Sequence, residues 1–174
     1  MNVAEASRAQ TNEATEMEFK HYAHCQGIAL AHFQFTPAYR RDIFKDEKVK
    51  SEIVACMRDD AQKMGVEIEA LGFGPDHAHM YLSGWKNHAI SRMAQQFKGH
   101  SSHVVREKHW DRVKTKLWGN KFWTSGYFFE TVGRVAPDDI EWYVAKGQQK
   151  HWADPEDFKE VTLVKGQMAL SDYN

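Results

Sequence analysis

The sequence predicts a two-layer α+β sandwich, in which helices cover one face of an antiparallel sheet. Three observations predict it. Segments with strand-like alternation of apolar residues are interspersed with segments of helical spacing. The order of these segments along the 174 residues is β-α-β-β-α-β-α. A chain of this length forms one domain with a sizeable core.

The first strand and helix are predicted in the N-terminal third of the chain. Residues 26–36 read QGIALAHFQFT and alternate as a strand requires, and Pro37 ends the pattern. Between residues 45 and 64 the apolar positions recur at helical spacing and charged residues fill the other face. Gly65 is placed as the C-terminal cap of this helix.

Two strands in hairpin contact are predicted next, over residues 66–73 and 77–83. The Gly74-Pro75-Asp76 segment forms the turn between them. Alternation gives the second strand two distinct faces. One face carries Ala78, Met80 and Leu82, and the other carries His77, His79 and Tyr81.

The C-terminal half is predicted to contribute a helix, a strand and a final helix. The helical pattern starts near Ile90, is interrupted at Gly99 and continues to Lys108, before a basic irregular stretch. Residues 121–132 are aromatic and β-prone, and residues 138–149 form a last helix after Pro137. The complete order matches a ferredoxin-like or RRM-like sandwich with an added C-terminal, tyrosine-bearing helix.

The expected domain organisation is simple. Residues 1–20 are an N-terminal extension, residues 21–152 the catalytic domain, and residues 153–174 a C-terminal tail.

Composition excludes several classes of protein. Hydrophobic residues make up 42% and charged residues 27% of the chain, which is typical of a globular domain and not of a disordered one. The net charge of −1 gives no overall basic field, so a nucleic-acid surface must come from local clusters of Lys and Arg. The two cysteines lack C-x-x-C spacing, and no run approaches a signal peptide or membrane span. These features predict a cytoplasmic protein with reduced thiols.

Two motifs can carry chemistry. His77 and His79, two residues apart on a strand, point to the same side and can offer imidazole nitrogens to one metal ion. Taken alone, an H-x-H pair is more often structural. Tyr143, on a stripe of the last helix, is likewise most simply a packed aromatic. Together, however, a phenolate can attack phosphorus while a metal polarises the phosphate.

Basic, aromatic and hydroxyl side chains occur together in three regions and suit a surface that pairs phosphates and stacks unpaired bases. The candidate DNA-binding residues are Arg40, Arg41, Arg92, Lys98, Ser101, Ser102, Lys121 and Trp123.

Five segments in order resemble the HUH-type single-tyrosine transposases of the smallest (IS200/IS605-like) insertion sequences. They are HFQFTPAYRRDIF, GVEIEALGFGPDHAHMYLSG, FKGHSSHVV, KLWGNKFWTSGYFFETVG and IEWYVAKGQQ, and they run from about Tyr22 to Gln149.

The resemblance implies a metal-dependent enzyme that binds subterminal DNA hairpins and cleaves and rejoins single-stranded DNA. Tyr143 would be the nucleophile, leaving a 5′-phosphotyrosine and a 3′-hydroxyl, with His77 and His79 as ligands to Mg²⁺ or Mn²⁺. It also implies a homodimer whose active sites are shared between subunits, with residues 133–137 as a hinge. The family places a third ligand, usually Gln, four residues after the tyrosine; this chain has Gly147 there, and Gln148 is the candidate instead.

Three alternatives remain open on the sequence. A domesticated or inactive copy would bind hairpin nucleic acid without cutting it, which the Gly147 departure motivates. A small metallohydrolase would use the metal to activate water, with Asp76 as the nearest carboxylate. An RRM-like RNA binder would stack bases on the sheet, although Tyr81 is the only aromatic on the histidine face of its strand.

Overall fold

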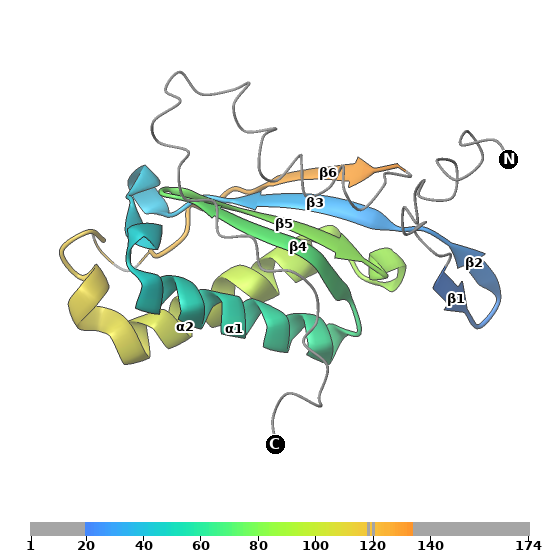
Figure 1. The fold of residues 1–174 in the computed structure, drawn as a ribbon, viewed down its shortest axis with the longest axis horizontal. Coiled ribbons are helices and arrows are strands. Elements are labelled where there is room, and N and C mark those ends of the chain that lie inside the picture. Colours follow the sequence, from blue (N-terminus) through green and yellow to red (C-terminus); the bar gives the residue numbers. More distant parts are fainter. Residues whose placement is uncertain (1–19, 118, 120, 134–174) are drawn as a thin grey trace, which may run out of the picture.

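The computed structural model describes residues 20–117, 119 and 121–133. Over this range the predicted two-layer α+β sandwich is confirmed: an antiparallel sheet of four strands has two long helices on one face (Figure 1). The strands of this sheet are β3 (Leu30–Phe35), β4 (Glu67–Gly74), β5 (His77–Ser83) and β6 (Phe128–Val132), and the helices are α1 (Glu47–Met64) and α2 (Ile90–Val113). The order across the sheet is β4-β5-β3-β6.

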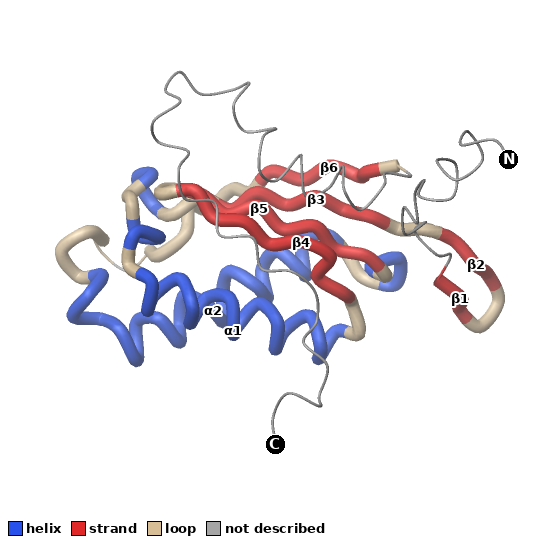
Figure 2. Tube along the Cα trace, in the orientation of Figure 1, coloured by secondary structure: helices blue, strands red, loops and turns tan. Residues whose placement is uncertain are grey.

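A small hairpin stands apart from the main sheet. Strands β1 (Lys20–Tyr22) and β2 (Cys25–Gly27) pair with each other and project beyond the end of the four-stranded sheet (Figure 2). The strand predicted over residues 26–36 is therefore divided. Its apolar part is the central strand β3, and its first two residues belong to the hairpin.

The first helix follows the sequence signals closely. Asp46 caps its N-terminus by accepting hydrogen bonds from the backbone amides of Lys48 and Val49. Gly65 ends it in the left-handed conformation, with φ of 67°, which glycine adopts without a steric cost.

The second helix differs from its prediction, because Gly99 does not interrupt it. Helix α2 spans Ile90–Val113 and continues through Gly99; its one kink lies at His109, where φ is −128° and ψ is 23°. A glycine inside a helix costs about 1 kcal/mol relative to alanine. Burial of Phe97 and Val105 on either side of Gly99 offsets this cost.

The strand predicted over residues 121–132 also differs, since β6 begins only at Phe128. Phe122 and Trp123 turn into the core instead, where both are almost fully buried. Trp123 makes an isolated antiparallel bridge with Pro37, and its indole NH donates to the hydroxyl of Ser101 at 3.0 Å. Packing of two large aromatics thus overrides local β propensity.

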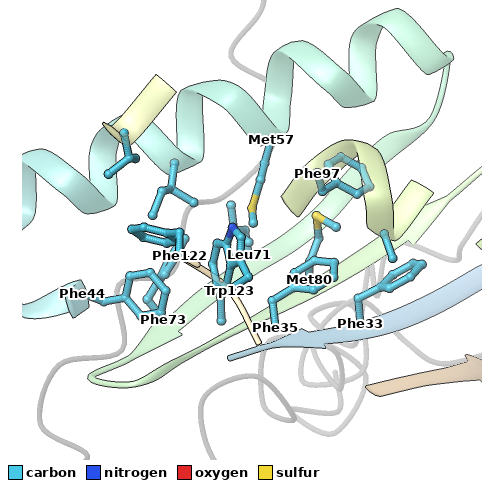
Figure 3. Packing of buried hydrophobic residues seen from close by; sticks show 14 of the residues in the cluster. Phe33, Phe35, Phe44, Met57, Leu71, Phe73, Met80, Phe97, Phe122 and Trp123 are labelled. Atoms are coloured by element: carbon cyan, nitrogen blue, oxygen red, sulfur yellow. The ribbon is translucent and has the colours of Figure 1, made fainter. Parts of the chain in front are cut away.

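The core fills the space between the sheet and the two helices. Phe33, Phe35 and Met80 point from the sheet towards Met57 of α1 and Phe97 of α2 (Figure 3). This face of β5 is the predicted apolar face, so the alternation of the strand is confirmed. His77, His79 and Tyr81 therefore lie on the opposite face, away from α1 and α2.

Candidate metal centre and nucleic-acid surface

The H-x-H pair lies on β5, an internal strand with β4 on one side and β3 on the other. We expected a face left uncovered by the helices, and α1 and α2 do lie on the other side. The histidine side chains are nevertheless buried: His77 is 5% exposed and His79 is 9% exposed. Their ring centroids are 5.1 Å apart, with nearly perpendicular planes. Two imidazoles at this spacing can reach a common ion.

His77 is oriented by a carboxylate from the preceding turn. Its Nδ1 lies 2.7 Å from Oδ1 of Asp76, and Oδ2 of Asp76 accepts from Nε of Arg40 at 2.8 Å. Because a carboxylate accepts, Nδ1 of His77 carries the proton, and Nε2 carries the lone pair that a metal needs. Arg40 comes from a 3₁₀ turn in which Tyr39 and Arg40 both have positive φ, 61° and 51°.

His79 is held from the other side, through a second imidazole. Its Nδ1 is 2.8 Å from Nε2 of His32 on β3, and Nδ1 of His32 is 2.9 Å from Oε1 of Glu130 on β6. His32 also stacks on Tyr81, with centroids 4.5 Å apart and planes 5° from parallel. His32 and Glu130 were not among the predicted site residues. One feature of the sequence pointed to His32, since alternation places His32 and Gln34 on one face of the first predicted strand.

Burial sets the protonation of these groups. Burial, assisted by the nearby charges of His32 and His77, lowers the pKa of His79 to about 2. Burial also lowers the pKa of His32, against the opposing effect of Glu130. Burial favours a raised pKa for Asp76, but hydrogen bonds from His77 and Arg40 outweigh it and hold that pKa below its ordinary value. A neutral imidazole is the form that binds metal.

The free energy of unfolding of the metal-free protein should fall as the pH drops below about 6.5. The unfolded chain protonates residue 79 near pH 6.5, whereas the folded chain keeps it neutral down to about pH 2. The unfolded state therefore binds the extra proton, and stability falls with acid by up to about 1.4 kcal/mol per pH unit. Denaturant titrations in chelator, from about pH 7.5 to about pH 5, measure this slope. His79→Gln should reduce this slope and leave the part that the lowered pKa of His32 contributes, whereas His103→Gln, on the exposed face of α2, should leave the slope unchanged.

Glycines of β4 lie opposite both histidines. Gly74 pairs with His77 and Gly72 with His79 in the antiparallel register. A Cβ at Gly74 would lie 2.3 Å from Cε1 and 2.6 Å from Nε2 of His77. The imidazole of His77 thus occupies the space that a side chain at residue 74 would fill.

Gly74→Ala should therefore displace His77 and weaken metal binding and cleavage together. We expect an overpacking cost of about 1–3 kcal/mol in stability, and a larger relative loss at the site because the Asp76 hydrogen bond is broken. Titration calorimetry with Mn²⁺ measures the loss of metal affinity. Gly126→Ala is the matched control, because a Cβ there meets nothing within 4 Å. Equal Mn²⁺ affinity in both variants would contradict the steric role of Gly74.

Several candidate DNA-binding residues gather on the helix side of the sheet. Lys98, Ser102, Lys121 and Trp123 line one surface cavity of about 550 Å³, together with Tyr127. Nζ of Lys98 donates to the carbonyls of Ser125 and Gly126 and lies 5.8 Å from the centroid of the Tyr127 ring. Burial lowers the pKa of Lys98.

The other candidates are dispersed. Arg92 lines an adjoining cavity of about 760 Å³, which shares Gln95 and Gly99 with the first. Arg40 bonds Asp76 in the turn before β5, and Arg41 follows it in the sequence. Ser101 is fully buried and donates to the carbonyl of Phe97, so its position does not support a phosphate contact. Trp123 is 5% exposed, and its position favours packing over base stacking.

A second group of potential ligands lies between the helices. Asp59 and Asp60 of α1 and His100 of α2 bring one ligand atom each within 4.8 Å of one another, and Oδ2 of buried Asp60 has no hydrogen-bond partner among the described residues. Nζ of Lys63 donates to Oδ2 of Asp59, and Oδ1 of Asp60 is hydrogen-bonded by Gln96 and by Nδ1 of His100. This cluster joins α1 to α2 and is separate from the H-x-H pair.

Several predicted features lie outside the described residues: Tyr143, Gln148, the helix over 138–149, residues 134–137 of the hinge, the tail over 153–174 and the extension up to residue 19. Within the described part of the chain, no helix is long and apolar enough to cross a bilayer.

Comparison with known proteins identifies the family. The family described as "Transposase IS200 like" matches residues 27–147. The transposase of insertion sequence IS200 from Salmonella typhimurium is 31% identical over 115 residues, which cover 66% of this chain and 74% of that protein. The ISDra2 transposase TnpA of Deinococcus radiodurans is 28% identical over 119 residues, covering 68% and 84%.

Solved structures share the fold. A crystal structure assigned as a transposase of Deinococcus radiodurans R1 superposes with a TM-score of 0.58 at 26% identity, covering 79% of this chain and 100% of that one. A REP-associated tyrosine transposase bound to a REP hairpin superposes with a TM-score of 0.53 at 14% identity, covering 84% and 82%. By the match to the family and to these relatives, the chain belongs to the IS200-like transposases, a family of DNA-cleaving enzymes.

Proposed function

We propose that this protein binds hairpins near the ends of an insertion sequence and cleaves and rejoins single-stranded DNA, with Tyr143 as nucleophile beside a metal held by His77 and His79. The observation that carries the proposal is the pair of buried imidazoles, each supported through Nδ1 by its own acceptor. A metal-binding histidine almost always donates its other ring nitrogen to such an acceptor, which fixes the tautomer and the ring orientation.

The donor set fits a divalent metal. With Nδ1 as the protonated nitrogen, Nε2 of each ring carries the lone pair that can bind a metal, and the low pKa of His79 keeps its ring neutral. Mg²⁺ prefers oxygen ligands, while Mn²⁺ accepts imidazole more readily, so we propose Mn²⁺ as the tighter of the two. When bound, the ion would polarise the scissile phosphate. Gln148 is the proposed third ligand.

The proposed cleavage reaction needs no cofactor other than the metal. The Tyr143 phenolate oxygen attacks phosphorus, forming a phosphotyrosine at the 5′ end, and the bond from phosphorus to the 3′ oxygen breaks. The 3′ oxygen takes up a proton and leaves as a hydroxyl. Because the new phosphodiester keeps the energy of the old one, a 3′-hydroxyl of another strand can attack it and rejoin the DNA.

The DNA contacts are proposed on two parts of the surface. Lys98, Ser102 and Lys121 form a groove on the helix side that suits a hairpin backbone. Arg41 and Tyr39, which is 66% exposed, flank the Arg40–Asp76 pair and suit the strand entering the metal site. A REP hairpin bound to a transposase of the same fold supports hairpins as the ligand.

The remaining proposals follow from the family resemblance. We propose a homodimer that shares its active sites between subunits, with residues 133–137 as the hinge before the helix that carries Tyr143. The catalytic domain would span residues 21–152, in the cytoplasm of the host cell.

A covalent-adduct assay tests the proposal. The full chain is incubated with end-labelled single-stranded hairpin DNA from the flanks of its own gene, with Mn²⁺ or Mg²⁺, and the products are resolved on a denaturing gel. A labelled protein–DNA adduct that disappears with chelator supports the proposal. Hairpin binding with no adduct would favour the non-cutting binder, and metal-dependent cutting with no adduct would favour a metallohydrolase.

A further inference from the structure

We propose that His32 and Glu130 are positioning residues that fix His79 as the Nδ1-protonated tautomer and so present its Nε2 lone pair to the metal. The inference rests on the proposed function, since it concerns the metal held by His77 and His79. It adds two residues from two other strands to that site, and it explains why a buried histidine occupies β3 beside a ligand strand.

The sheet register brings the three residues into one row. Glu130 of β6 lies directly opposite His32 of β3, and His79 of β5 pairs with Gln34, two residues further along β3. Residues two apart on a strand share a face, so His32 and His79 are diagonal neighbours on the histidine face. The row therefore crosses three adjacent strands, from the edge strand to the ligand strand.

Hydrogen bonding then determines which nitrogen carries each proton. An ionised carboxylate only accepts, so Nδ1 of His32 donates to Glu130 across 2.9 Å. A neutral imidazole has one N–H, which leaves Nε2 of His32 as an acceptor. Nδ1 of His79, 2.8 Å away, must be the donor in that bond. Nε2 of His79 is then the nitrogen with a lone pair.

Packing fixes the ring planes along this row. His32 is 3% exposed and stacks on Tyr81, while Phe128 meets it edge-on with centroids 5.7 Å apart. The Glu130 side chain is 41% exposed, so the row begins with a hydrated carboxylate and ends at a buried ligand. A partly hydrated carboxylate pays a smaller burial cost than a fully buried one and can still orient groups further inside.

The two ligands thus have independent supports. His77 is oriented directly by Asp76, which Arg40 holds in place. His79 has no carboxylate of its own among the described residues and depends on an intermediate imidazole. Substituting Glu130 should therefore affect His79 and leave the Asp76–His77 hydrogen bond intact.

Two substitutions separate a positioning role from a structural one. Glu130→Leu removes the acceptor, and Mn²⁺ affinity should fall about 10- to 100-fold, the usual loss for an outer-shell partner. Glu130→Gln keeps the shape, but its amide can accept or donate, so either tautomer of His32 is satisfied. Its affinity should lie between those of the wild type and the leucine variant. If the role of Glu130 were purely structural, the glutamine variant would bind Mn²⁺ with the affinity of the wild type.

The experiment combines Mn²⁺ titration calorimetry with ¹⁵N spectra of the histidine rings in the metal-free full chain. We expect His79 to be protonated at Nδ1 in the wild type and in the control Glu107→Leu, whose glutamate is exposed on α2. A mixture of tautomers is expected in Glu130→Gln. If Glu130→Leu does not fold, the glutamine variant alone carries the test, because it preserves volume and polarity.

The outcomes distinguish this inference from the proposed function. An unchanged His79 tautomer and unchanged Mn²⁺ affinity in the Glu130 variants would overturn the positioning role while leaving the metal site intact. Wild-type protein that binds no Mn²⁺ through His77 and His79 would overturn the metal site itself, and the positioning role with it. Loss of affinity together with a mixed tautomer supports the inference.

Discussion

Tyr143→Phe is expected to form no covalent protein–DNA adduct and to lose cleavage by at least about 10⁴-fold, while binding hairpin DNA with an affinity close to that of the wild type. The substitution removes only the phenolic oxygen, which is the atom proposed to attack phosphorus. Removing a nucleophile from a covalent mechanism leaves only the catalysis that binding and electrostatics provide. The ring of phenylalanine retains the packing of tyrosine, so the fold should survive.

The measurement compares three readouts on one hairpin substrate: adduct formation, strand cleavage and equilibrium binding at a stated salt concentration. Tyr22→Phe is the control for loss of a phenolic hydroxyl, because Tyr22 belongs to β1 of the separate hairpin and not to the proposed DNA-binding groove. Cleavage by Tyr143→Phe at the wild-type rate would exclude the phosphotyrosine mechanism. Water activated by the metal would then be the better account.

The bounds of an element could be predicted from the sequence where its own residues carry the signals that start and end it. The strand at His77 to Ser83 has the predicted bounds, because strict alternation and the Gly74-Pro75-Asp76 turn are local signals. Helix α1 ends at Met64, as Gly65 indicated. The two faces of β5 followed from the same alternation, and with them the placement of both histidines.

Features that depend on distant packing were not predictable in this way. Gly99 lies inside a continuous helix because of the core contacts around it, and Trp123 is buried because it meets Ser101 and Pro37. Neither contact is visible in a local pattern. Residue type alone therefore did not reveal that Ser101 and Trp123 are buried.

The supports of the candidate metal site show the same limit. Glu130 and His32 are 98 residues apart in sequence and meet only because β6 pairs with β3 in one register. A shift of one residue would send Glu130 to the opposite face. A spacing of two residues is enough to propose His77 and His79 as ligands, whereas the residues that hydrogen-bond His79 and His32 depend on the register of three strands.

His77→Ala and His79→Ala are each expected to lower Mn²⁺-dependent cleavage by about 10²–10³-fold or more, which corresponds to the several kcal/mol that a polarising metal supplies. Hairpin binding should change little in either variant. The groove lined by Lys98 and Lys121 involves α2, which covers the face of the sheet opposite to the one that carries His77 and His79 (Figure 1).

The two substitutions should not be additive, because either one leaves a single imidazole that cannot hold the ion alone. The double variant should then be no slower than the slower single variant, as expected for residues that act as a unit. Mn²⁺ titration of all three variants, with cleavage measured on the same preparations, tests this. His103→Ala on the exposed face of α2 is the control for loss of an imidazole. Losses that multiply in the double variant would mean that His77 and His79 act separately, one of them outside the metal site.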